Sequence, residues 1–252
     1  MLDTECYSFP KSSEQILFRN LGYPITRKPN GKVIESINPG YSTFETKFNL
    51  SGEIDIFEEN LINKSKIILI AGKRGSGKST LGFRVLENIK TSSARPMFTI
   101  GVSQELLPYW ITAIESIEEA ENNGVILVDE GAISFSCRNS MSAKNKELSN
   151  LLAIARHKDM TLILITQNTS MIDKNVLNLC DTIVLKEGSL LQSEMERICI
   201  RKLYKRANGY FRQLDEDLTS YAYIIDDEFE GVVKTRLPSF WREEISKNGV
   251  LK

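Results

Sequence analysis

The sequence has few of the residues that disulfide frameworks and metal sites need. Its 252 residues include four cysteines and one histidine. The cysteines lie far apart and form no Cys-x-x-Cys pair, so we expect reduced structural thiols rather than a disulfide framework or a zinc site. The single histidine, His157, excludes a histidine-rich metal site, and it lies in no motif typical of a Ser-His-Asp hydrolase.

Long apolar runs and an excess of one charge sign are also absent. The longest apolar runs have the length of a strand, so we expect no integral membrane segment. The N-terminal stretch Met1–Gln15 lacks the apolar part of a signal peptide, and we expect the protein in the cytoplasm. The formal net charge is −1, which restricts any nucleic-acid surface to a local patch.

The sequence does contain a phosphate-binding motif. Ile67–Ala71 is a short apolar run, typical of a strand buried on both faces of a parallel sheet. Gly72–Ser79 follows and matches G-x-x-x-x-G-K-[ST], whose glycines let successive N–H groups point at a phosphate. A helix predicted over Lys78–Asn88 directs its positive end at the same anion. The residues expected to bind nucleotide are Gly72, Lys73, Arg74, Gly75, Ser76, Gly77, Lys78, Ser79 and Thr80.

Two adjacent carboxylates end a later apolar run, Val125–Gly131. A strand of this kind opens at its carboxyl end into the ligand crevice of a parallel sheet. Asp129 and the Ser79 hydroxyl are candidates to hold Mg²⁺, directly or through water, and Glu130 is a candidate to polarise the attacking water. The alternative is a solvated acidic turn.

Two further residues are candidates for the same site. The run Thr161–Asn168 predicts a core strand, and Gln167 near its end can hydrogen-bond the γ-phosphate or the attacking water. Arg156 lies at the end of a helix predicted over Asn145–Lys158. It either complements the helix dipole or serves as an arginine finger for the nucleotide of a neighbouring subunit.

Residues 1–60 predict an N-terminal extension, which includes a hairpin over Tyr23–Ser36. Residues 61–190 predict the ATPase core, within which the apolar spacing favours a helix over Ile111–Asn122. Residues 191–252 predict a helix and a late hairpin packed on the core.

Two polar stretches are candidates for contact with DNA. The first is the loop Ala132–Lys144, and the second is a basic helix predicted over Ser189–Arg206. A plain flexible loop and a solvated helix face are the alternatives. The candidate contacts in these stretches are Arg138, Lys144, Arg197 and Arg201.

The order of these blocks resembles the HerA/FtsK superfamily of nucleic-acid-pumping ATPases. GKRGSGKST, VILVDEG, ARHKDMTLILITQN and IDKNVLNLCDTIVL follow one another between Lys66 and Leu185. Within the superfamily, the compact chain is most similar to the genome-packaging ATPases of viruses with internal membranes, many of them archaeal. The filamentous-phage branch, related to the Zot toxin, has a membrane segment that this sequence lacks, which favours the packaging branch.

The resemblance implies an α/β fold of the RecA-like (ASCE) P-loop NTPase class, with a mainly parallel five-stranded core sheet and small β additions at both ends. It implies ATP and Mg²⁺ as cofactors, Asp129 as the Walker B acid, Glu130 as the catalytic acid and Gln167 as the sensor. Members of the superfamily act as rings, usually hexamers, with an arginine finger in trans. Arg156 matches that finger here, and Arg138 and Arg74 are the alternatives.

The function expected from this resemblance is ATP-driven translocation of double-stranded DNA into a viral capsid. Such a protein would work in the host cytoplasm or on the virion, with capsid or vertex proteins as partners. The alternatives are a plasmid or chromosome DNA pump of the same superfamily, and a nucleotide-gated assembly protein that moves nothing. An ABC-type ATPase would need an LSGGQ-like helix start before the second acidic block, which is absent. A small-molecule kinase needs no adjacent Asp-Glu pair.

Overall fold

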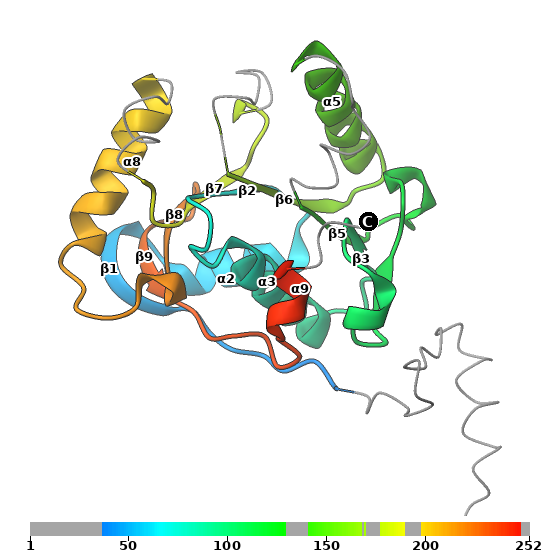
Figure 1. Cartoon of the computed structure of the whole chain (residues 1–252), viewed down its shortest axis with the longest axis horizontal. Helices are drawn as coiled ribbons and strands as arrows, with labels where there is room; N and C mark the ends of the chain where they lie inside the picture. The colour runs from blue at the N-terminus through cyan, green and yellow to red at the C-terminus, as the bar shows by residue number, and fades with distance from the viewer. Residues whose placement is uncertain (1–36, 130–140, 168, 170–176, 190–197, 248–252) are drawn as a thin grey trace, which may run out of the picture.

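The computed structural model describes residues 37–129, 141–167, 169, 177–189 and 198–247. The hairpin predicted over Tyr23–Ser36 lies outside these residues. Within them, nine strands form a single sheet in the order β1-β9-β8-β7-β2-β6-β5-β3-β4 (Figure 1). The three segments predicted from the sequence, 1–60, 61–190 and 191–252, all contribute strands to it.

Six neighbouring strands of this sheet are parallel and form its core. Every residue of the central strands β2 and β6 is buried, because helices cover both faces of a parallel sheet. The predicted five-stranded parallel core is confirmed with one strand more. The six strands are β7 (Thr182–Leu185), β2 (Ile67–Ala71), β6 (Thr161–Thr166), β5 (Val125–Val128), β3 (Met97–Ile100) and β4 (Ile111–Ala113).

Three antiparallel strands extend the sheet beyond β7. The predicted late hairpin is formed by β8 (Tyr221–Ile225) and β9 (Phe229–Lys234), and β8 pairs with β7. The outer neighbour of β9 is β1 (Glu45–Gly52), whose Glu45 lies opposite Lys234. A strand from near the start of the described chain and one from near its end are therefore neighbours in the sheet.

Helices cover both faces of the sheet (Figure 1). On one side lie α2 (Ile54–Asn63), α3 (Lys78–Ser92) and α9 (Glu243–Lys247), and on the other lie α5 (Met141–His157) and α8 (Ile198–Phe211). In the described part of the chain, the connections contain the short 3₁₀ turns η1 (Gln104–Leu106), η2 (Ile117–Glu119) and η4 (Leu218–Ser220). No helix of the described residues is both long enough and apolar enough to cross a membrane.

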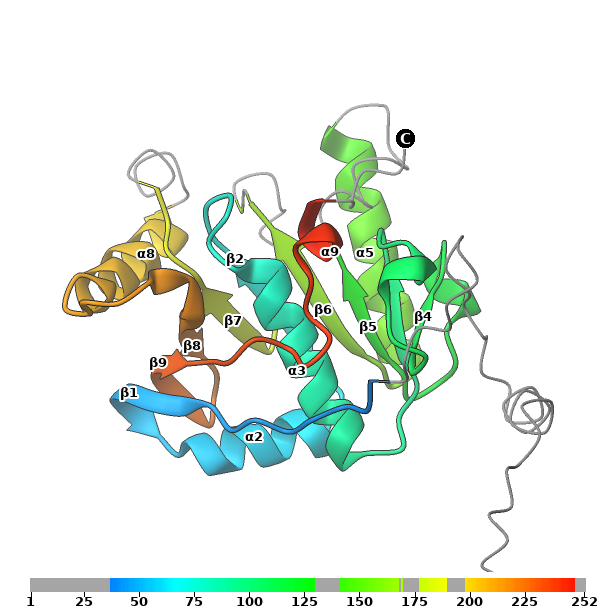
Figure 2. The ribbon, with the colours of Figure 1, turned by 60° about the horizontal axis from the view of Figure 1, so that its bottom comes forward.

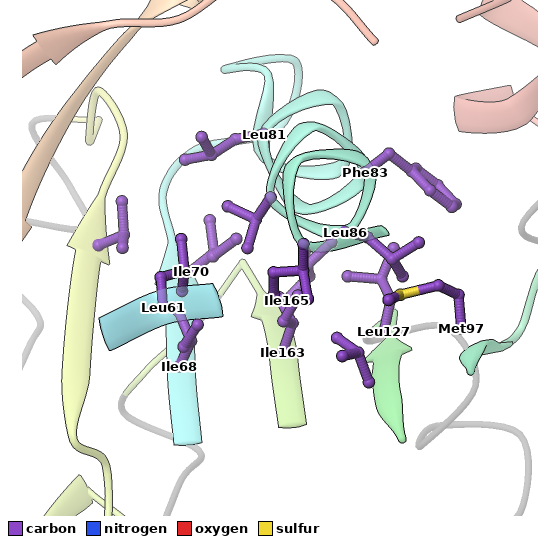
Figure 3. Close-up of a cluster of buried hydrophobic side chains, with 14 of the residues drawn as sticks. Leu61, Ile68, Ile70, Leu81, Phe83, Leu86, Met97, Leu127, Ile163 and Ile165 are labelled. Atoms are coloured by element: carbon purple, nitrogen blue, oxygen red, sulfur yellow. The ribbon is translucent and has the colours of Figure 1, made fainter. Parts of the chain in front are cut away.

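The helix α3 packs along the middle of the sheet (Figure 2). Its Leu81 and Leu86 lie over isoleucine and leucine side chains of β2, β6 and β5 (Figure 3). Each such buried side chain contributes about 1.5–3 kcal/mol relative to exposure. This packing fixes the start of α3, and with it the loop that precedes the helix.

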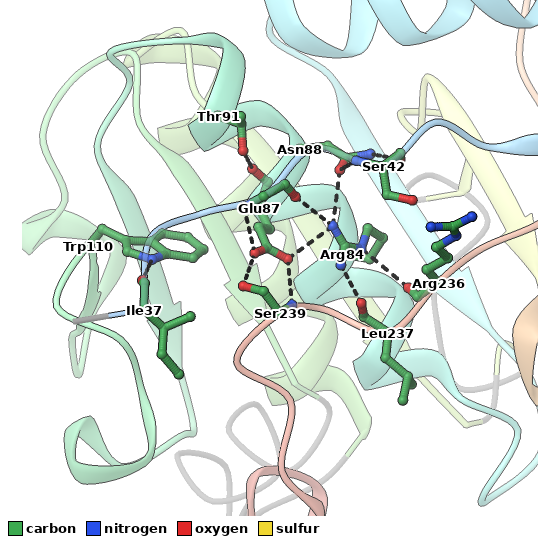
Figure 4. A network of polar contacts seen from close by, with 11 residues as sticks. Ile37, Ser42, Arg84, Glu87, Asn88, Thr91, Trp110, Arg236, Leu237 and Ser239 are labelled. Carbon is green, nitrogen blue, oxygen red and sulfur yellow. Dashed lines mark hydrogen bonds and ion pairs between the residues drawn. The ribbon is translucent and has the colours of Figure 1, made fainter. Parts of the chain in front are cut away.

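Polar contacts on the outer side of α3 hold both ends of the described chain (Figure 4). The buried Glu87 carboxylate accepts the N–H of Gly40 at 2.9 Å and the N–H of Ser239 at 3.0 Å. The buried Arg84 donates to the Gly40 carbonyl at 2.8 Å and pairs with Glu87 at 3.0 Å. Asn88 exchanges two hydrogen bonds with the backbone of Ser42. One helix thus binds the segments before β1 and after β9.

The prediction of a helix over Ile111–Asn122 is wrong. The structure has the strand β4 (Ile111–Ala113) and the single turn η2 (Ile117–Glu119) there. Ile111 is fully buried and pairs with Met97 of β3, so sheet pairing takes the first residues of the apolar pattern. Ser116 and Glu119 form a capping box at η2, and Ala120 has an extended backbone, which ends the turn.

Candidate nucleotide-binding site

The loop between β2 and α3 has the backbone of a phosphate-binding loop. Gly75 and Gly77 have φ angles of 75° and 84°, in the left-handed region that favours glycine. Gly77 is also the N-cap residue of α3, which begins at Lys78. A Cβ atom at Gly77 would lie 2.5 Å from the carbonyl oxygen of Thr219, so a larger residue would force the loop away. The loop therefore directs the start of a 15-residue helix at the position of an anion.

Side chains within the motif are held against the loop. The Lys78 amine and the Ser76 hydroxyl each donate to the Lys73 carbonyl, at 2.8 Å. Lys78 and Ser76 are buried, whereas Arg74 and Gly75 are exposed. The hydrogen bond to Lys73 keeps the Lys78 amine beside the loop, where it can bind a phosphate.

Ser79 and Asp129 come together from two different elements. The Ser79 hydroxyl donates to the Asp129 carboxylate at 3.3 Å. Ser79 lies in the first turn of α3, and Asp129 directly follows β5. A hydroxyl and a carboxylate are the oxygen ligands that Mg²⁺ prefers, so the pair fits the predicted metal site.

Gln167 lies at the same edge of the sheet. It follows Thr166, the last residue of β6, which pairs with Ala71 at the end of β2. Because β6 lies between β2 and β5, Gln167 follows the strand that separates the phosphate loop from Asp129. Its side chain is exposed.

Arg156 lies away from the phosphate loop of its own chain. It is in the last turn of α5, which ends just before β6 begins, at the amino edge of the sheet. Its side chain is exposed and donates to the Leu179 carbonyl at 3.0 Å. The position excludes a role in hydrolysis at its own loop.

The remaining predicted residues lie away from the phosphate loop in the sequence. Glu130, Arg138 and Arg197 lie outside the described residues, and Lys144 belongs to α5 but its side chain is outside them. Arg201 lies in α8 and is half-buried.

Sequence reasoning missed Lys186, which follows β7 and is fully buried beside the phosphate loop. Its N–H donates to the Ala71 carbonyl at 2.8 Å, and its amine donates to the Thr219 carbonyl at 2.7 Å. Burial lowers the pKa of Lys186 to about 7; nearby Asp217 opposes this shift and Lys78 adds to it. A lysine after an apolar strand looks like an ordinary strand end, so the sequence carried no signal for this contact.

The match of a protein-family model agrees with this architecture. The model for zonular occludens toxin (Zot) matches residues 82–189, a range that includes Asp129 and Gln167. Most of the matched range lies in the part of the chain, Lys66–Leu185, to which the HerA/FtsK resemblance extends. No curated protein matches the sequence.

Solved structures similar to this chain include three proteins of low sequence identity. The pCW3 conjugation coupling protein TcpA, in a monomer form with ATPγS, has a TM-score of 0.50 and 11% identity over 96% of this chain and 85% of its own. The DNA-packaging ATPase B204 of Sulfolobus turreted icosahedral virus has a TM-score of 0.47 and 15% identity over 69% of this chain and 99% of its own. The N-terminal domain of zonular occludens toxin from Neisseria meningitidis has a TM-score of 0.34 and 16% identity over 48% of this chain and 76% of its own.

The phosphate loop between β2 and α3 and the parallel sheet behind it give this chain the P-loop NTPase fold, which TcpA shares. Together with the match to the Zot model, the shared fold confirms that the chain resembles the HerA/FtsK-type P-loop ATPases.

Proposed function

We propose that this protein is an ATP-driven translocase that packages viral double-stranded DNA. The observation that carries the ATPase part of this proposal is the meeting of the phosphate loop, the Ser79–Asp129 pair and Gln167 at one edge of the sheet. A P-loop NTPase needs this combination to bind a triphosphate, hold a metal ion and position water.

The proposed chemistry is hydrolysis of ATP by positioning and charge stabilisation. The N–H groups of the loop and the Lys78 amine hold the phosphates. Ser79 and Asp129 would hold Mg²⁺, which would neutralise phosphate charge. Glu130 orients the attacking water, and Gln167 hydrogen-bonds the γ-phosphate or that water.

The helix α8 supports a contact with the DNA backbone. Its 14 residues include four basic and no acidic side chains, so a local basic surface exists on a chain of net charge −1. Lys202, Lys205 and Arg206 are exposed, as is Arg212 just beyond the helix, and Arg206 pairs with Glu230. Phosphate contacts of this kind bind DNA without reading its sequence. Arg138, Lys144, Arg197 and Arg201 stay candidates for further contacts.

The proposal includes a homo-oligomeric ring, a hexamer by resemblance, with Arg156 as the finger in trans. The exposed position of Arg156 at the amino edge supports a contact with a neighbouring subunit rather than with its own nucleotide. Capsid or vertex proteins would be the docking partners, in the host cytoplasm or on the virion.

Steady-state ATP turnover with and without linear duplex DNA tests the proposal. We expect DNA to stimulate turnover by the wild type. The Glu130→Gln variant should bind ATP but turn it over about 10²–10⁴-fold more slowly, since it lacks the base that orients water. Glu59→Gln, which changes an exposed carboxylate of α2, is the matched control and should leave turnover unchanged. Normal turnover by Glu130→Gln, or no effect of DNA on the wild type, would contradict the proposal.

The match to TcpA favours a second candidate, the transfer of plasmid DNA, because it extends over 96% of this chain. Both candidates predict DNA-stimulated hydrolysis. Expression of Glu130→Gln during infection separates them: packaging predicts capsids that lack DNA, and plasmid transfer predicts filled capsids.

A further inference from the structure

One side of the phosphate loop is formed by residues outside the P-loop motif. The segment that follows β7 runs along the loop, and the Glu187 carbonyl accepts the Lys73 N–H at 3.0 Å. The side chains of Lys73 and Glu187 form an ion pair at 2.7 Å. The turn η4, which directly precedes β8, meets the loop at Gly77.

Lys186 fills the space between this segment, the loop and η4. A Cβ atom at Gly72 would lie 2.7 Å from Cβ of Lys186, and one at Gly77 would lie 3.5 Å from its Cε atom. Its amine reaches the Thr219 carbonyl, the same oxygen that would lie 2.5 Å from a Cβ at Gly77. Lys186 therefore touches both ends of the loop and connects them to η4.

An amine is a costly way to fill this space. A buried amine loses its hydration, and an apolar side chain of similar volume would pack without that loss. The neighbouring Lys78 makes the position less favourable still, since its charge acts on Lys186 with the same sign. A polyphosphate on the loop would relieve this repulsion, because in a poorly solvated site the attraction between opposite charges is strong.

We propose that Lys186 is a positioning residue for nucleoside di- and triphosphates: it holds the loop between Gly72 and Gly77 against Thr219, so that the loop N–H groups are fixed for the phosphates. This inference rests on the proposed function in one respect, that the ligand is a nucleotide. It gives the residue after β7 and the turn η4, both outside the P-loop motif, a role in nucleotide binding.

Lys186→Met tests the inference, since methionine keeps most of the volume and removes the amine. We expect the Kd for ADP, measured by calorimetry, to rise about tenfold to a hundredfold, as for the loss of a hydrogen bond made by a charged group. The KM for ATP should rise with it while kcat stays within about threefold, because fixed N–H groups bind ground state and transition state alike. A merely structural role would instead lower the fraction of active protein, which reduces kcat at an unchanged KM.

Two further variants make the test specific. Val232→Ala shortens a buried side chain of β9 and serves as the control for lost stability, with an expected unchanged Kd for ADP. Asp217→Ala removes the side chain that caps η4 by accepting from Thr219, at an exposed position that folding tolerates. It should raise the Kd for ADP roughly two- to fivefold, the size of a lost cap.

The outcomes are distinguishable. If the wild type binds neither ADP nor ATP, the proposed function fails. If the wild type binds while Lys186→Met and Asp217→Ala bind equally well, or if Val232→Ala weakens binding as much as they do, the role of Lys186 is refuted. If Lys186→Met does not fold, Asp217→Ala decides the question alone.

Discussion

The amine of Lys186 has an ordinary pKa of 10.5 and a pKa of about 7 in the folded protein, because it is buried. Between these two values the unfolded chain keeps a proton that the folded chain has released. The free energy of unfolding of the wild type should therefore rise, relative to that of Lys186→Met, as pH increases from about 7 to about 10. Urea denaturation of both proteins across this range measures the difference. A difference that stays constant with pH would show that the amine is not buried as the structure has it.

Residues of the phosphate site were predictable where neighbours in the sequence create the site. The glycines, Lys78 and Ser79 of the loop form one continuous motif, and Asp129 follows directly on an apolar strand. Lys186 was not predictable, because its partner Thr219 lies 33 residues further along the chain. Only the pairing of β7 with β2 and of β8 with β7 brings these residues together.

Among the elements, α3 carries the polar contacts that hold the segments before β1 and after β9. Glu87→Ala should lower the free energy of unfolding by about 3–5 kcal/mol, because it leaves the buried Arg84 without its carboxylate. Urea denaturation measures the change. Glu59→Ala on the exposed side of α2 is the control, with an expected effect within about 0.5 kcal/mol. Equal effects of the two substitutions would refute a stabilising role of the network.

The helix α8 should respond to reversal of its charge. We expect the double variant Lys202→Glu/Lys205→Glu to lose DNA stimulation of ATP turnover while it keeps the basal rate, since like charges repel the phosphates. Arg236→Glu/Arg242→Glu changes the net charge equally, at exposed residues that precede α9 in the chain, and should keep the stimulation. Loss of stimulation in both double variants would indicate an effect of overall charge rather than a surface on α8.

Elements were predicted best where the local pattern and the sheet agree. The strand predicted over Ile67–Ala71 has the bounds of β2, and the helices expected after the phosphate loop and before β6 are α3 and α5. Ile111–Asn122 was mispredicted because three apolar residues at helical spacing also suit a short strand followed by a turn. The free edge of β3 decides in favour of the strand, and that edge exists only in the folded sheet.

At the scale of the whole molecule, the proposed ring makes hydrolysis depend on assembly. Arg156→Ala should hydrolyse ATP poorly but regain activity when mixed with Glu130→Gln, which supplies an intact finger to the neighbouring site. An arginine finger contributes about 10³–10⁵ in rate, so even partial recovery is measurable in a turnover assay. Mixed rings without any recovery would refute Arg156 as the finger. Glu130→Gln alone is the control for residual turnover.

The pairing of β1 with β9 has a consequence for folding during synthesis on the ribosome. Glu45 of β1 pairs with Lys234 of β9, so β1 leaves the ribosomal exit tunnel long before its partner strand has been translated. Thr219, which supports the phosphate loop, is also made late. A nascent chain therefore acquires its outer strands and the full support of its phosphate loop only when residues 219–234 have been translated, and until then the edge of β1 is open to other unfinished chains.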